Sequence, residues 1–92
     1  MVKGKTKSGF KFEVSKRVTN DWRFTVALAD MDSNDESRAI AGSVAVVRLL
    51  LGDQEQAFYK HLQENDGTVP TEKVWAEITE IIQEMGKPVK KS

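Results

Sequence analysis

The sequence predicts a mainly α fold (α+β) in which an N-terminal β-hairpin precedes a set of short helices, and three observations support this. Residues 10–14 alternate apolar and polar, which is the period of a strand with one covered face. From residue 20 onward, apolar residues recur at spacings of three and four, the period of a helix. Glycine and acidic or amide residues divide that pattern into about four helices. At 92 residues, the chain is expected to form one compact domain.

The boundaries of each element follow from turn and capping residues. We expect a hairpin at 3–14, helices at 20–32, 34–51, 53–65 and 70–85, and a basic tail at 86–92. Side chains that can accept hydrogen bonds from a first helical turn precede the first three helices. The predicted capping groups are Thr19 or Asn20, then Ser33 with Glu36, then Asp53 with Gln56.

The predicted helix at 20–32 is apolar on two sides. Trp22 and Val26 share one side, whereas Phe24, Leu28 and Met31 lie almost opposite. Such a helix is either sandwiched inside the domain, which we expect, or it presents one side to a partner.

The helices at 34–51 and 70–85 each carry one clear apolar stripe, which we expect to face the core. Gly42 permits a close approach of a neighbour, and Gly52 is placed to end its helix. The glutamates of the last helix lie away from its stripe and predict a solvated face. The stripes are Ile40, Val44, Val47 and Leu51, and Val74, Trp75, Ile78, Ile81, Ile82 and Met85; the glutamates are Glu72, Glu77, Glu80 and Glu84.

Composition excludes several classes of chemistry. The chain has no cysteine, so it has no disulfide, thiol nucleophile or Cys-ligated metal. The longest apolar run, 39–51, contains Arg48 and is shorter than the roughly 20 residues that span a bilayer. No apolar stretch of signal-peptide length follows the lysine-rich N-terminus. We therefore expect a soluble cytoplasmic protein with no membrane contact.

Three partial motifs lack the partners that their chemistry needs. Gly4-Lys5-Thr6 has no room upstream for the rest of a phosphate-binding loop. The acidic segment 30–34 lacks the glycine and the final glutamate of a calcium loop. His61, the single histidine, has only carboxylates as possible partners and predicts a boundary residue beside the core. We expect no catalytic residue, no cofactor and no metal site.

Charge is unevenly distributed, although the net charge is zero. Residues 1–17 are basic, 18–85 are acidic and 86–92 are basic. Lysines interleaved with Phe10 and Phe12 are compatible with nucleic-acid binding. Strand alternation instead places both phenylalanines on one covered face, and the acidic body repels phosphate. A helix-turn-helix formed by the second and third helices is also disfavoured, because Asp53, Glu55 and Glu64 lie where a recognition helix needs basic residues.

Residues 6–86 resemble the small tail assembly chaperones of long-tailed (siphovirus-type) bacteriophages and prophages. The resemblance depends on the order and spacing of four phrases: Thr6-Lys7-Ser8-Gly9-Phe10-Lys11-Phe12-Glu13-Val14, Asn20-Asp21-Trp22, Val47-Arg48-Leu49-Leu50-Leu51-Gly52-Asp53 and Asn65-Asp66-Gly67-Thr68-Val69-Pro70. It implies a non-enzymatic protein that binds the tape measure protein, keeps it soluble, assists assembly of the tail tube protein and forms homo-oligomers. The alternatives are a small cytoplasmic nucleic-acid-binding regulator and a minor structural tail component.

The resemblance carries over no catalytic residue, so a binding site must be sought among apolar surfaces. More helix faces are apolar than the predicted elements readily cover, and a surplus face is suited to an amphipathic helix of a partner. The predicted partner-binding residues come from the hairpin and the first helix: Phe10, Phe12, Trp22, Phe24, Leu28 and Met31.

Overall fold

The chain begins with the predicted hairpin. The computed structural model describes residues 2–86. Strands β1 (Val2–Lys5) and β2 (Lys11–Val14) pair antiparallel, and Gly4 lies opposite Phe12. The ring of Phe12 lies directly over Gly4, where an added Cβ would meet ring carbon Cζ at 2.6 Å. The turn closes where Thr6 N donates to Phe10 O over 2.9 Å.

Helices form most of the remaining chain, which confirms the mainly α fold. Their bounds lie within three residues of the predicted ones, and one short 3-10 helix after β2 was not predicted. The remainder of the predicted basic tail, 87–92, lies outside the described residues. In chain order the elements are η1 (Lys16–Asn20), α1 (Trp22–Met31), α2 (Glu36–Leu51), η2 (Gly52–Gln54), α3 (Glu55–Leu62) and α4 (Thr71–Gly86).

The predicted N-caps are wrong in detail. α1 is capped by Asp21, whose carboxylate accepts from Arg23 N, because Thr19 is used inside η1, where its hydroxyl donates to Lys16 O. α2 is capped by Asp35, and Ser33 instead accepts from the Asp35 N–H. A carboxylate accepts such bonds more strongly than a hydroxyl, so the nearest aspartate takes the cap.

The third predicted cap is replaced by a contact across the fold. Asp53 lies within η2, and the next residue, Gln54, makes no side-chain cap for α3. The Gln54 amide instead accepts from Glu13 N over 2.9 Å and donates to Glu13 O over 2.7 Å. It therefore pairs with β2 as a neighbouring strand would, and fixes the hairpin to the α2–α3 corner.

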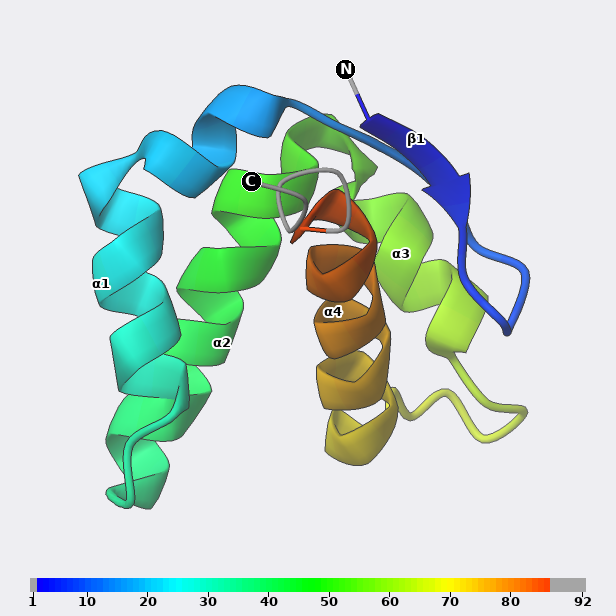
Figure 1. Cartoon of the computed structure of the whole chain (residues 1–92). Helices are drawn as coiled ribbons and strands as arrows, with labels where there is room; N and C mark the ends of the chain where they lie inside the picture. Colours follow the sequence, from blue (N-terminus) through cyan, green and yellow to red (C-terminus); the bar gives the residue numbers. More distant parts are fainter. Residues whose placement is uncertain (1, 87–92) are drawn as a thin grey trace.

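α1 and α2 form a closely packed antiparallel pair (Figure 1). Gly42 makes this approach possible, because a Cβ there would meet the backbone of α1 at Met31 N and at Ala27 O. The predicted close approach at Gly42 is confirmed. The inner side of α1 buries Phe24 and Ala27 against α2, while the other side stays uncovered.

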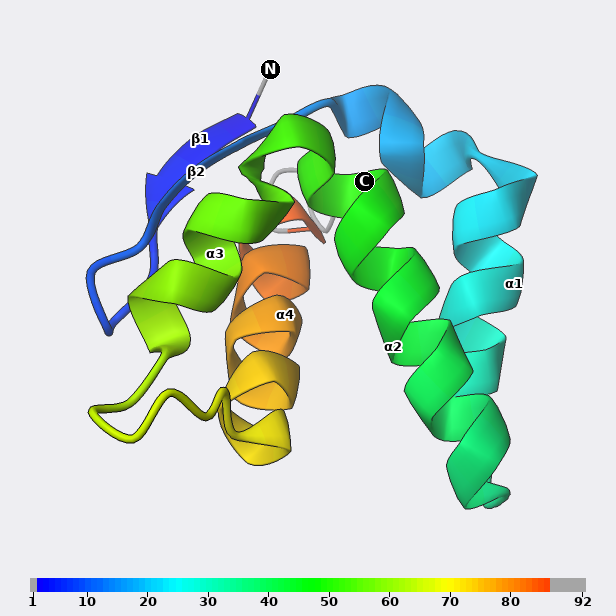
Figure 2. The ribbon, with the colours of Figure 1, turned by 180° about the vertical axis from the view of Figure 1, so that it is seen from behind.

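The hairpin, α3 and α4 form the other half of the molecule, with the hairpin beside α3 (Figure 2). Phe10 meets the ring of Phe58 edge-on, with centroids 5.2 Å apart. The core runs through both halves and joins the inner faces of all these elements. Its buried members are Phe10, Phe12, Val14, Val18, Phe24, Ala27, Val46, Val47, Leu50, Leu51, Phe58, Leu62, Ile78, Ile81 and Met85.

Candidate functional site: an apolar groove between α2 and α4

An apolar groove separates α2 from α4. Its volume is about 350 Å³, within the range of natural ligand pockets. α2 and α4 both begin at the same end of the molecule, and they diverge toward that end (Figures 1 and 2). We call this feature the α2–α4 groove; its lining residues are Ile40, Ser43, Val44, Val47, Tyr59, Val69, Thr71, Val74 and Trp75.

Three large apolar side chains of the α2–α4 groove are exposed. Ile40 is 48% exposed, and Val44 and Trp75 are each 36% exposed. The expectation that Ile40 and Val44 face the core is wrong, whereas Val47 and Leu51, from the same stripe, are buried. The reason is geometric: α2 and α4 diverge toward the N-terminus of α2, so the part of the stripe nearest that end is left uncovered (Figures 1 and 2).

A chain of hydrogen bonds crosses the floor of the groove. The Trp75 indole Nε1–H donates to Ser43 Oγ over 2.5 Å, and the Ser43 hydroxyl donates to Ala39 O over 2.8 Å. The indole is thereby held in one orientation with part of its ring exposed. An aromatic side chain fixed before binding loses less conformational entropy when a partner packs on it.

The Ser43 hydroxyl is expected to stabilise Trp75 specifically. Removing it by Ser43→Ala leaves the indole N–H without its acceptor, and we expect a coupling energy of about 1 kcal/mol between the two side chains. The measurement is a double-mutant cycle with Trp75→Phe in urea unfolding. If Ser43→Ala lowers the free energy of unfolding equally with tryptophan or phenylalanine at residue 75, the expected stabilising hydrogen bond is contradicted. Ser37→Ala on the exposed side of α2 is the control.

Polar groups at the α3 side of the groove are also satisfied within the chain. The Tyr59 hydroxyl donates to Glu55 Oε2 over 2.9 Å, and Arg48 Nε lies 3.4 Å from the same oxygen. Burial, followed by the bond to Glu55, raises the pKa of Tyr59 to about 12. Tyr59 therefore stays neutral at physiological pH and presents its ring to the groove.

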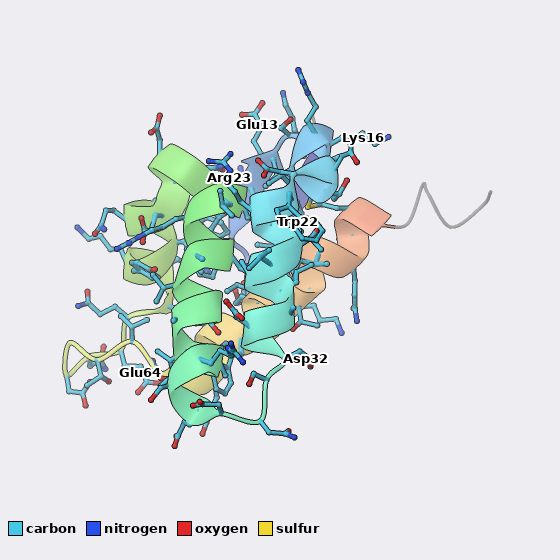
Figure 3. The ribbon with its side chains drawn as sticks, turned by 90° about the vertical axis from the view of Figure 1, so that its left-hand side faces the viewer. Glu13, Lys16, Trp22, Arg23, Asp32 and Glu64 are labelled. Carbon is cyan, nitrogen blue, oxygen red and sulfur yellow. The ribbon has the colours of Figure 1, made fainter. Side chains whose placement is uncertain are left out.

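The structure separates the six predicted partner-binding residues. Phe10, Phe12 and Phe24 are no more than 7% exposed and belong to the core, so the expectation that they offer a free surface is wrong. Leu28 and Met31 are half-buried against that core. Trp22 is 75% exposed on the outer side of α1 (Figure 3).

α1 is covered on one side only, so the sandwiched arrangement is wrong. α2 covers the side that carries Phe24, while Trp22 and Val26 face away from the molecule. The exposed side of α1 therefore carries Trp22, one of the predicted partner-binding residues, whereas the side that carries Phe24, Leu28 and Met31 faces α2 and the core. The two-sided apolar pattern was the correct signal, but the pattern does not say which side a neighbour covers.

A second cluster joins the hairpin turn to α3 and α4. His61 is exposed; its ring lies against Phe10, with centroids 5.6 Å apart, and its Nε2 is 3.0 Å from Ser8 Oγ. Lys7 N donates to Glu80 Oε2 over 2.8 Å. Glu77 is buried, contrary to the expected solvated face, and its Oε1 has no hydrogen-bond partner among residues 2–86. The contacts of Lys7 and Ser8 anchor the turn to the helices.

Two other structural features are absent from residues 2–86. In that range no three His, Asp or Glu side chains gather closely enough to hold a metal ion. Over the same residues no helix combines the length and the apolar character that a membrane span requires. No protein-family model, no curated protein and no solved structure matches the chain.

Proposed function

We propose that this protein is a tail assembly chaperone of a long-tailed bacteriophage or prophage. In this role it binds the tape measure protein, keeps it soluble and assists assembly of the tail tube, with no catalytic step. The observation that carries the proposal is the α2–α4 groove, with exposed Ile40, Val44 and Trp75. The resemblance of residues 6–86 to these chaperones names the client.

The α2–α4 groove supports the proposal because it leaves apolar surface uncovered at a defined place. A small domain gains about 25 cal/mol for each Å² of apolar surface that it buries, so leaving such residues exposed forgoes stability. Contiguous exposed apolar surface on a small protein marks an interaction site. Laying the apolar face of a helix into a groove is a common way to bind a helical segment. A client rich in amphipathic helices would be shielded from aggregation by this contact.

Co-expression tests the role and the site together. The tape measure protein is produced with the wild-type chain, with Ile40→Asp/Val44→Asp, or with Trp22→Asp/Val26→Asp, and its soluble fraction is measured. We expect the groove variant to lose solubilisation and the α1 variant to retain it. Both pairs replace two exposed apolar residues with aspartate, so the change in net charge is matched, and the α1 pair removes the larger apolar surface.

The two variants also separate the possible failures. No solubilisation by the wild-type chain would overturn the chaperone role. If only the Trp22→Asp/Val26→Asp variant loses solubilisation, the client binds the outer side of α1 and not the groove. Circular dichroism of both variants checks that the helices persist. The proposed homo-oligomer is measured separately by sedimentation of the wild-type chain and both variants.

A further inference from the structure

The end of the molecule at which the α2–α4 groove opens is acidic. Two segments lie at this end, one on each side of the groove: the α1–α2 connection at 30–38 beside α2, and the α3–α4 connection with the first turn of α4 at 64–73 (Figures 1 and 2). Together they carry seven carboxylates against two basic side chains, Arg38 and Lys73. Asp32 and Glu64 lie at this end, and Lys16 lies at the opposite one (Figure 3). We call the two segments the acidic mouth.

Some carboxylates of the acidic mouth are engaged within the chain. Asp30 pairs with Arg38 and Glu64 pairs with Lys73, at 3.4 and 2.8 Å. Asp35 caps α2, as described above. Asp66 accepts from Thr68, and the Thr68 backbone and hydroxyl bonds lower the pKa of Asp66. These groups have structural roles.

Three further carboxylates have no such role. Within residues 2–86, no hydrogen bond or ion pair holds the side chains of Asp32, Glu36 and Glu72. Glu36 lies one helical turn before Ile40 on α2, and Glu72 lies three residues before Trp75 on α4. Each wall of the groove therefore continues from an exposed apolar side chain to a free carboxylate.

We infer that the α2–α4 groove takes an amphipathic protein helix that ends in lysines or arginines, with this basic end in the acidic mouth. The inference rests on the proposed function and specifies the chemistry of the client segment. The indole N–H of Trp75 and the hydroxyl of Tyr59 both donate their hydrogen bonds to acceptors within the chain. The groove is therefore suited to apolar side chains. The free carboxylates of Glu36 and Glu72 favour cationic side chains at the end of the bound helix.

The experiment uses two synthetic peptides and the tryptophan of the groove. Each peptide has about 18 residues, with leucines at helical spacing and no tryptophan, and ends in three lysines or three glutamates. Lysines at the C-terminus also suit the peptide's own helix dipole. The full chain carries Trp22→Phe, so Trp75 reports binding through a blue shift of its emission.

We expect the lysine peptide to bind about tenfold more tightly than the glutamate peptide at about 50 mM NaCl. About 500 mM NaCl is expected to remove most of the difference, because exposed charges are then screened. Glu36→Lys/Glu72→Lys is expected to abolish or reverse the preference. Glu13→Lys/Asp53→Lys, with the same change in net charge away from the mouth, is expected to retain it. Ile40→Ser/Val44→Ser is expected to lower the affinity for both peptides by the same factor.

Equal affinity for the two peptides at low salt, no binding of either, or a preference that survives Glu36→Lys/Glu72→Lys would overturn the inference. Co-expression with the tape measure protein distinguishes this from failure of the proposed function. If the wild-type chain and the Glu36→Lys/Glu72→Lys variant solubilise the client equally, the chaperone role stands and the charge rule fails. Circular dichroism confirms that each lysine variant remains helical.

Discussion

Replacing Phe58 with alanine is expected to lower the free energy of unfolding by about 3–5 kcal/mol, the largest effect of any substitution considered. Phe58 is 0% exposed and lies where α3 meets the hairpin. Its ring contacts Phe10 edge-on and Tyr59 at 5.9 Å between centroids. Alanine leaves a cavity at this junction and also removes both aromatic contacts, each worth about 0.5–1.5 kcal/mol beyond burial.

The loss of stability in Phe58→Ala is measured by urea unfolding, with circular dichroism as the signal. Small domains have total stabilities of about 5–15 kcal/mol, so the variant is expected to be partly unfolded under mild conditions. Phe58→Leu is the matched control, because it keeps most of the volume and is expected to cost far less. A loss below about 1 kcal/mol for Phe58→Ala would mean that the α3–hairpin contact contributes little to stability.

Gly42→Ala is expected to destabilise the protein by about 1–3 kcal/mol, although alanine is the better helix former by about 1 kcal/mol. The added Cβ would meet Met31 N, and would lie 2.7 Å from both Ala27 O and Asp30 Cβ. Two of these atoms belong to the backbone of α1, so the clash is relieved only if α1 moves away from α2. The sign of the effect is therefore opposite to that of helix propensity.

The measurement is again urea unfolding, with Ala41→Gly as the control on the exposed side of α2. Ala41→Gly is expected to lower the free energy of unfolding by about 1 kcal/mol through helix propensity alone. Alanine is thus expected to be the more stable residue at 41, and glycine at 42. A gain in stability for Gly42→Ala would show that α1 and α2 pack less closely than described. Because Trp22 lies on α1, a change in its fluorescence would indicate that α1 has moved.

Local sequence was sufficient to predict which segments form strands and helices, but not which residues cap the helices. The hairpin and four helices were predicted from periodicity, because alternation and 3.6-residue spacing are properties of a single segment. The caps were mispredicted at Ser33 and Asp53, since several neighbouring residues could accept the same bonds. Gln54 was not recognised, because its partner, Glu13, is distant in sequence.

The candidate site was predicted only in kind. An excess of apolar helix face correctly indicated an uncovered surface, but three of the six residues predicted to form it, Phe10, Phe12 and Phe24, are buried. Phe24 was assigned to a partner and is core, while Ile40 was assigned to the core and is exposed. Both residues lie on apolar stripes, and a stripe does not show whether a neighbouring element covers each of its residues.

The sequence by itself determined which segments become strands and helices, which faces of them are apolar, and that Gly42 admits a close neighbour. Tertiary structure alone decided which apolar faces are covered, because burial depends on where a second element lies. α1 covers one side of α2, while α4 diverges from α2 toward the N-terminus of α2. Ile40, Val44 and Trp75 therefore line a groove rather than a core, and the two acidic connections lie at the same end of the molecule, on either side of this groove.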